Sequence, residues 1–126
     1  MTQEEKDLLL KDLCARLPYG IICEDGYGNV LELNGIDKPN TATFKCSDKT
    51  FWTTDLDKCK PYLFPLSSMT EEQTEELIKL INTGQNDNNE FMRSLCRIEF
   101  YHKNHFDYRG LIEKGLANDA TGLNIY

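Results

Sequence analysis

The sequence predicts an α+β fold with one N-terminal helix, a small antiparallel sheet and two or three C-terminal helices. Three observations predict this order. Apolar residues recur with helical spacing near the N-terminus, β-rich runs separated by turn residues fill residues 20–60, and helix-start motifs follow in the second half. Four short strands joined by tight turns favour either a small Src-homology-3-like (SH3-like) barrel or a twisted meander sheet.

The chain has the size and composition of one globular domain. Of its 126 residues, 40% are hydrophobic and 28% are charged, which excludes a disordered or fibrous chain. At this length, folding requires neither a disulfide nor a metal. We divide the single domain into a helix, a β-rich part, a helical part and a tail, which cover residues 1–17, 20–66, 67–117 and 118–126.

The first helix is predicted by its start and by its apolar stripe. Thr2 and Glu5 have the spacing of a capping box, and Pro18 ends the helix because the residue before a proline avoids helical space. Leu13 lies inside the stripe and is expected, with Leu10 and Leu17, to be buried against the barrel. The apolar positions share one helical face, at Leu10, Leu13, Cys14 and Leu17.

The β-rich part ends in a segment with two prolines. Residues 25–29 form a turn with two glycines, so Tyr27 is expected to be exposed there. The prolines within residues 60–66 lack N–H donors, which predicts an extended segment that is not a central strand. We expect this segment to cross the open end of the barrel with Tyr62, Leu63 and Phe64 as anchors, and we assign Pro61 and Tyr62 structural roles.

Two helices and a shorter third are predicted after residue 67. Capping-box spacing at Ser68–Glu71 and Thr70–Gln73 begins the first, Gly84 ends it, and a polar linker covers residues 85–89. The next helix covers residues 90–104, and a short one covers residues 108–114 with Asp107 as its N-cap. The expected buried stripe of the first of these helices is Thr74, Leu77, Ile78 and Ile81.

Charge and cysteine pattern exclude several classes of protein. A net charge of −7 disfavours general binding to a nucleic-acid backbone. The N-terminus lacks the basic start and apolar run of a signal peptide, and no apolar run is long enough for a membrane span, so we expect a cytoplasmic protein with no membrane contact. The five cysteines form no Cys-x-x-Cys pair, and we expect free, mostly buried thiols.

No catalytic residue is predicted, because the sequence lacks phosphate-binding glycine loops and nucleophile motifs. No cofactor is predicted either. His102 and His105, with Asp107 nearby, are the candidates for a metal site. The competing interpretation is structural: His102 continues the stripe of Leu95 and Ile98, and Asp107 caps a helix. We predict no metal.

The residues predicted to bind a partner are aromatic or multivalent side chains near turns. Tyr27 and Tyr108 combine apolar area with a polar tip, which suits an interface. Arg109 offers a planar fork of donors for a carboxylate or phosphate, or for a structural carboxylate of the sheet. His105 lies in the same corner of the sequence.

Three blocks of the sequence carry a family resemblance. Residues 13–20 (LCARLPYG), 60–70 (KPYLFPLSSMT) and 105–117 (HFDYRGLIEKGLA) resemble a family of small uncharacterised proteins of Bacteroides-type gut bacteria and their phages and prophages. The blocks touch the start, middle and end of the chain. The resemblance implies a bacterial or phage setting, and it implies no activity, cofactor or site residue.

Our first functional hypothesis is a non-enzymatic interaction module of phage or mobile-element origin, whose partner is another protein. The alternative is an acidic counter-defence inhibitor of a host nuclease or other nucleic-acid-binding protein, for which the glutamates between Glu71 and Glu76 would supply the acidic face. A small enzyme ranks third. The sequence leaves the oligomeric state open.

Overall fold

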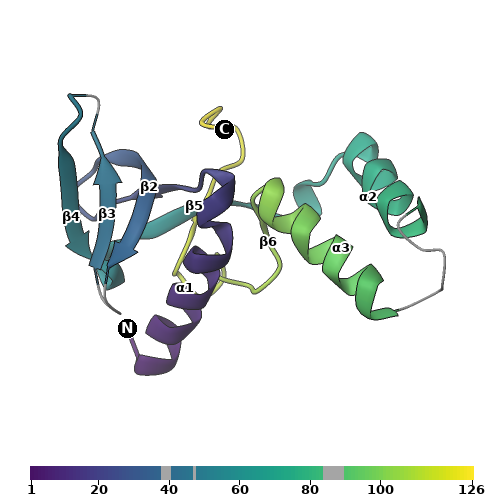
Figure 1. Cartoon of the computed structure of the whole chain (residues 1–126), viewed down its shortest axis with the longest axis horizontal. Helices are drawn as coiled ribbons and strands as arrows, with labels where there is room; N and C mark the ends of the chain where they lie inside the picture. Colours follow the sequence, from purple (N-terminus) through teal and green to yellow (C-terminus); the bar gives the residue numbers. More distant parts are fainter. Residues whose placement is uncertain (38–40, 47, 84–89) are drawn as a thin grey trace.

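The protein is described by a computed structural model, which covers residues 1–37, 41–46, 48–83 and 90–126. A mixed seven-stranded sheet runs through the body, α1 (Gln3–Arg16) packs beside it, and the pair of α2 (Glu71–Thr83) and α3 (Glu90–Lys103) extends from the far end (Figure 1). The α+β class is therefore confirmed. The strands are β1 (Ile22–Glu24), β2 (Val30–Asp37), β3 (Thr41–Lys45), β4 (Phe51–Asp55), β5 (Lys60–Pro65), β6 (Phe106–Asp107) and β7 (Asn118–Asp119).

Helix α1 begins as predicted and buries a different face. Thr2 and Glu5 form a reciprocal capping box. Leu13 is fully buried in the main core, as expected, whereas Cys14 is exposed. The buried positions have helical spacing but include two charged residues, and they are Leu9, Asp12, Leu13 and Arg16. Leu10 and Leu17 are only half-buried at the edge of this face.

The first four strands form an antiparallel meander that curls without closing. The sheet order is β4-β3-β2-β1-β5-β6, with β7 also paired to β5. A closed barrel would require β4 to pair with a further strand. Instead the chain leaves β4 through the short 3-10 helix η2 (Leu56–Lys58) and enters β5, which pairs with β1. The hydroxyl of Thr54 donates to the carbonyl of Asp25, 3.5 Å away, so β4 approaches the β1–β2 loop without a ladder. The SH3-like barrel is thus wrong, and the twisted open sheet is the correct alternative.

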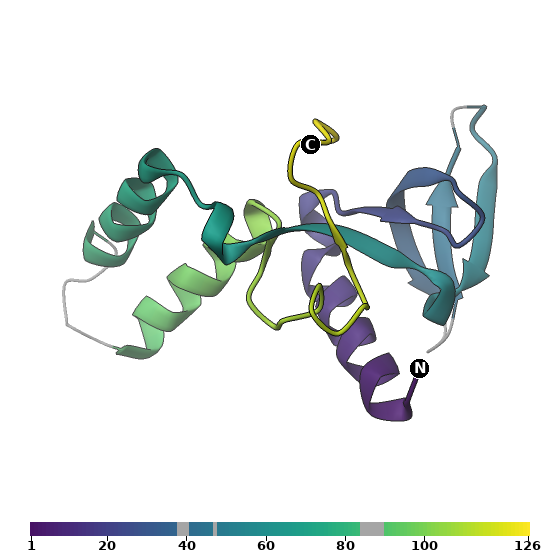
Figure 2. The same ribbon diagram turned by 180° about the vertical axis from the view of Figure 1, so that it is seen from behind.

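Strand β5 lies inside the sheet, which corrects the prediction for residues 60–66. It pairs antiparallel with β1 and parallel with both β6 and β7. The prolines are tolerated because Pro61 and Pro65 stand near the two ends of the strand, while Phe64 between them donates its N–H to the carbonyl of His105, 2.8 Å away. Pro61 is fully buried, and Tyr62 is half-buried. The C-terminal tail, drawn in yellow, runs across β5 (Figure 2).

The helical pair α2–α3 has a small core of its own. Thr70 and Gln73 form the predicted capping box, whereas Ser68 donates to the carbonyl of Pro65 instead of capping α2. Leu77, Phe100 and Phe106 form the buried centre of this second cluster. The predicted stripe of α2 is only partly correct, because Leu77 is buried and Ile78 is 52% exposed. Gly84 and the linker 85–89 lie outside the described residues.

The segment after α3 contains turns where a helix over residues 108–114 was predicted. Gly110 and Gly115 both have a φ of 74°, a left-handed conformation that interrupts helical geometry. Asp107, the last residue of β6, still organises this segment. Its two carboxylate oxygens accept hydrogen bonds from the amides of Leu111 and Ile112, each 3.0 Å away. The carboxylate therefore acts as predicted, on a turn instead of a helix.

Candidate functional site

The open seam of the sheet contains a groove lined by exposed aromatic side chains. It has a volume of about 330 Å³ and lies where the curled sheet fails to close, between β4, the β1–β2 loop and η2. We call it the aromatic groove. Its lining residues are Tyr27, Thr41, Trp52, Thr53, Thr54, Asp55 and Lys58.

The β1–β2 loop fixes Tyr27 at the edge of the aromatic groove. The carboxylate of Asp25 is fully buried and accepts hydrogen bonds from the amides of Tyr27 and Asn29, at 2.8 and 3.1 Å, and from the side-chain amide of Asn29. These hydrogen bonds lower the pKa of Asp25 against the opposing and largest effect, desolvation by burial. Gly26 and Gly28, both with φ of 87°, supply the left-handed positions that the loop requires.

Tyr27, Trp52 and Lys58 form a small contact group in the groove. The rings of Tyr27 and Trp52 meet edge to face, with centroids 6.0 Å apart and planes at 86°. The ammonium of Lys58 lies 5.5 Å from the Tyr27 ring centre and 3.2 Å from its hydroxyl, and this hydrogen bond raises the pKa of Lys58. Tyr27 is 61% exposed and Trp52 is 41% exposed. Two large aromatic faces are therefore presented to solvent in one fixed arrangement.

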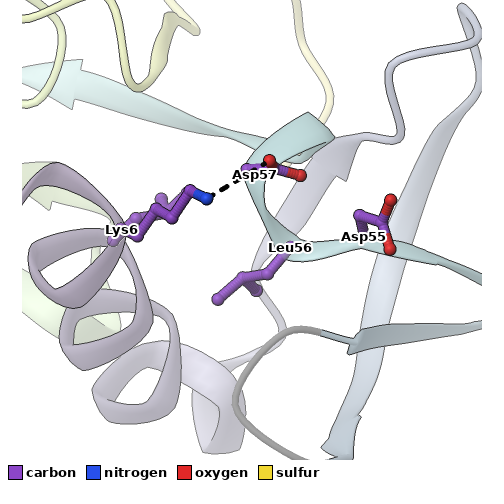
Figure 3. A pocket seen from close by; sticks show the side chains of 5 residues that line it. Lys6, Asp55, Leu56 and Asp57 are labelled. Atoms are coloured by element: carbon purple, nitrogen blue, oxygen red, sulfur yellow. Dashed lines mark ion pairs between the residues drawn. The ribbon is translucent and has the colours of Figure 1, made fainter. Parts of the chain in front are cut away.

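A second hollow, of about 170 Å³, lies between α1 and the β4–η2 turn (Figure 3). Lys6 reaches from α1 toward Asp57, and their charged atoms are 3.9 Å apart. Leu9 and Leu56 provide its apolar lining, and Asp55 belongs to both hollows. An exposed ion pair of this length contributes little to stability or recognition. This hollow therefore ranks below the aromatic groove.

A buried charged cluster joins α1 to the segment after β6. Asp12 and Arg16 are both 0% exposed, one helical turn apart, and the Nε of Arg16 donates to Oδ2 of Asp12 at 2.8 Å. The Nε of Arg109 donates to Oδ1 of the same carboxylate at 3.1 Å. Arg16 also donates from Nη2 to the carbonyl of Phe106 at 2.6 Å. The structural carboxylate for Arg109 thus comes from α1, and the sheet supplies none.

Tyr108 lies between the charged cluster and α3. The guanidinium carbons of Arg16 and Arg109 lie 5.5 and 4.9 Å from the centre of its ring. Its hydroxyl is 2.7 Å from Nε2 of His102, and its ring stacks on Tyr101. Burial, followed by the charge of Arg16, lowers the pKa of His102. His102 is therefore held by a tyrosine hydroxyl beside positive charges, a setting that favours its neutral form.

His105 packs against the last residue of the sequence. Its ring stacks on that of Tyr126, with centroids 3.7 Å apart, and its backbone has a left-handed φ of 61°. The Tyr126 hydroxyl donates to the carbonyl of Tyr62 at 2.7 Å and accepts from the amide of Ile22 at 3.0 Å, which bridges β1 and β5. The described residues contain no group of three or more His, Cys, Asp or Glu arranged to hold a metal.

The predicted binding residues fall into three places. Tyr27 belongs to the aromatic groove, whereas Tyr108 and Arg109 border the charged cluster and His105 packs on Tyr126. The sequence analysis missed Trp52, which an exposed position next to a turn could have indicated. It also missed Asp12 and Arg16, which share helical spacing with Leu9 and Leu13.

Comparisons with known proteins found no match for this chain. No family model matches the chain, and searches of curated proteins and of solved structures find no match. No helix in the described part of the chain is long and apolar enough to cross a bilayer.

Proposed function

We propose that the protein is a non-enzymatic interaction module that binds an extended segment of another protein in the aromatic groove. The observation that carries this proposal is the exposed edge-to-face pair of Tyr27 and Trp52. The phage or mobile-element setting of the proposal rests on the resemblance of residues 13–20, 60–70 and 105–117 alone.

The chemistry of the groove suits recognition of a peptide. Tyrosine and tryptophan supply large contact area with few rotatable bonds, and such residues dominate the binding energy of many interfaces. The hydrogen bonds of Asp25 already hold Tyr27 in place, so ordering this residue adds little cost on binding. Lys58 and Asp55 border the aromatic faces and offer polar contacts to a main chain or to side chains.

Binding fits the groove better than bond cleavage does. The lining residues that the structure describes include one carboxylate, Asp55, and one ammonium, Lys58, with tyrosine, tryptophan and threonine side chains around them. No histidine or cysteine is among them. A nucleophile with an adjacent general base is the arrangement expected for covalent catalysis, and the groove lining does not supply it.

The acidic-inhibitor alternative remains a second proposal, and the helical pair does not favour it. Four glutamates are exposed on α2, between Glu71 and Glu76. The neighbouring helix α3 carries Arg93, Arg97 and Lys103. A mimic of nucleic acid needs a continuous acidic surface, whereas α3 carries these three basic side chains and only two acidic ones, Glu90 and Glu99.

The experiment uses Trp52, which is the only tryptophan in the chain, so its fluorescence reports directly on the groove. A random-peptide display library is selected on the folded protein, and the enriched peptides are titrated while Trp52 emission is recorded. We expect a saturable change in emission for enriched peptides and none for scrambled ones.

A pair of variants distinguishes the groove from other surfaces. Tyr27→Ala should weaken peptide binding at least tenfold. Phe51→Ala is the matched control, because Phe51 is 60% exposed on the same strand as Trp52 and is not among the residues that line the groove. Equal affinity of the Tyr27→Ala variant and the wild type would refute the groove as the binding site.

A further inference from the structure

We propose that Arg109 forms a binding site for an oxyanion, a carboxylate or phosphate group, at the edge of the charged cluster. This site is separate from the aromatic groove and does not depend on the function proposed for it. The inference rests on three observations, which are an unbalanced charge, a guanidinium whose outer edge is accessible, and a rigid platform beneath that guanidinium.

The charge of the cluster is unbalanced. Asp12 is the carboxylate that pairs with both Arg16 and Arg109, one oxygen to each Nε. Two positive charges therefore share one negative charge. The other hydrogen-bond acceptor for Arg16 is the neutral carbonyl of Phe106. The Nη1 atom of Arg16 is buried without a partner. Burial of a charge is costly unless it is paired, so an additional anion near the cluster would be stabilising.

The neighbouring titratable groups do not supply that anion. His102 faces the cluster from α3, and its lowered pKa favours the neutral form. The charge of Glu99, on the same helix, affects the pKa of His102 less than the charge of Arg16 does. The carboxylate of Asp107 accepts hydrogen bonds from the amides of Leu111 and Ile112. In the described part of the chain none of these groups forms an ion pair with Arg109, so a ligand can supply a further oxyanion to its guanidinium.

The guanidinium of Arg109 is the accessible part of the cluster. Its side chain is 19% exposed, whereas those of Asp12 and Arg16 are 0% exposed. Its Nε is engaged with Asp12, and among the described residues none accepts a hydrogen bond from its Nη atoms. Neither Nη atom is buried without a partner, so both are reachable from solvent. A guanidinium edge of this kind binds two oxygens of a carboxylate or phosphate at once.

The platform beneath Arg109 fixes the direction of that edge. The guanidinium lies 4.9 Å above the centre of the Tyr108 ring. Tyr108 is itself held by the hydrogen bond between its hydroxyl and His102 and by stacking on Tyr101. The side chain is therefore ordered before any ligand arrives, which reduces the entropic cost of binding. The chain's charge of −7 repels long polyanions, so the site suits a single oxyanion group.

The test measures the melting temperature in titrations of sodium phosphate or sodium acetate, with sodium chloride holding the ionic strength constant. A ligand at ten times its Kd should raise the melting temperature by about 4–8 °C for a domain of this size. A rise with phosphate alone assigns the site to phosphate groups, and a rise with acetate alone assigns it to carboxylates. Melting temperatures in phosphate and in acetate that equal the melting temperature in sodium chloride alone would overturn the proposal.

Two variants and one spectroscopic measurement locate the effect. Arg109→Lys keeps the positive charge beside Asp12 but loses the guanidinium edge. The anion should therefore raise the melting temperature of this variant by less than half as much as it raises that of the wild type. Arg97→Lys, on the exposed face of α3, is the control and should respond as the wild type does. In the unmodified protein, phosphate or acetate should shift the side-chain Nε–Hε NMR signal of Arg109 and leave that of Arg97 in place. An unmoved Arg109 signal would overturn the proposal even if the Arg109→Lys variant does not fold.

Discussion

Arg109 donates a hydrogen bond of 3.1 Å to Asp12, a residue 97 positions earlier in the sequence. The same carboxylate accepts from Arg16 on its own helix, so Asp12 joins the first helix to the segment that follows β6. The sheet lies between these two segments in the chain order. A single buried carboxylate thereby ties the beginning of the fold to its end.

We predict that Asp12→Asn lowers the free energy of unfolding by about 3–5 kcal/mol, because it leaves two arginines next to a buried neutral amide. Urea unfolding followed by circular dichroism provides the measurement. Asp7→Asn is the control on the same helix, since Asp7 is exposed and accepts a hydrogen bond from the side chain of Gln3. A loss below about 1 kcal/mol for Asp12→Asn would show that the cluster is not stabilising.

Leu13→Ala should cost about 2–5 kcal/mol, the range for a buried leucine whose removal leaves a cavity. Leu13 is 0% exposed in the main core, together with Leu33 and Phe44. Leu10→Ala should cost less, because Leu10 is only half-buried. The comparison uses the same urea unfolding assay. A change below about 0.5 kcal/mol for Leu13→Ala would mean that α1 does not pack on the sheet in solution.

The five thiols should react in an order set by burial. Cys14 is exposed, Cys46 and Cys96 are half-buried, and Cys23 and Cys59 are buried. Burial raises the pKa of Cys23, and raises that of Cys59 to about 12, which suppresses the reactive thiolate. Mass spectrometry should find Cys14 alkylated first under native conditions, and all five cysteines alkylated in denaturant. Fewer than five in denaturant would reveal a disulfide.

Stability should fall as the pH is lowered from about 6.5 to about 4. Burial, followed by the charge of Arg16, lowers the pKa of His105 from its usual 6.5 to about 4. Between these values the unfolded chain binds a proton that the folded chain does not, so acid favours unfolding in this window, and the contribution of His105 levels off below pH 4.

The His105→Gln variant tests this pH dependence. Its free energy of unfolding should change less than that of the wild type between pH 6.5 and pH 4. The pKa of His102 is also lowered, so His102→Gln should reduce the slope as well, and the double variant most of all. An unchanged slope in the double variant would show that other groups control the response to acid.

Local sequence patterns predicted the elements well where each element is controlled by its own residues. The capping boxes of Thr2 with Glu5 and of Thr70 with Gln73 depend on contacts three residues apart, and both are present. Leu13 was placed in the core by the same kind of pattern. These features depend on helical spacing alone.

The errors arise where distant segments decide the outcome. A search for an apolar stripe passes over charged residues, so it could not predict that Asp12 and Arg16 are buried. Their burial depends on distant partners, because Asp12 accepts a hydrogen bond from Arg109 and Arg16 donates one to the carbonyl of Phe106. The prolines of β5 argued against a central strand, yet β5 lies inside the sheet and pairs with β1, β6 and β7. The aromatic groove depends on the curl of the sheet, which brings Trp52 beside Tyr27 across 25 positions of the chain.

The hydrogen bonds between the two ends of the sequence also constrain when the protein can fold during its synthesis. Arg16 donates a hydrogen bond to the carbonyl of Phe106. The hydroxyl of Tyr126 links Ile22 of β1 to Tyr62 of β5. A nascent chain that still lacks residues 106–126 has Arg16 without its carbonyl acceptor, Asp12 without Arg109, and β1 and β5 without the link through Tyr126. We therefore expect the native state to form only after residues 106–126 have been synthesised, because the contacts that complete it join distant parts of the sequence.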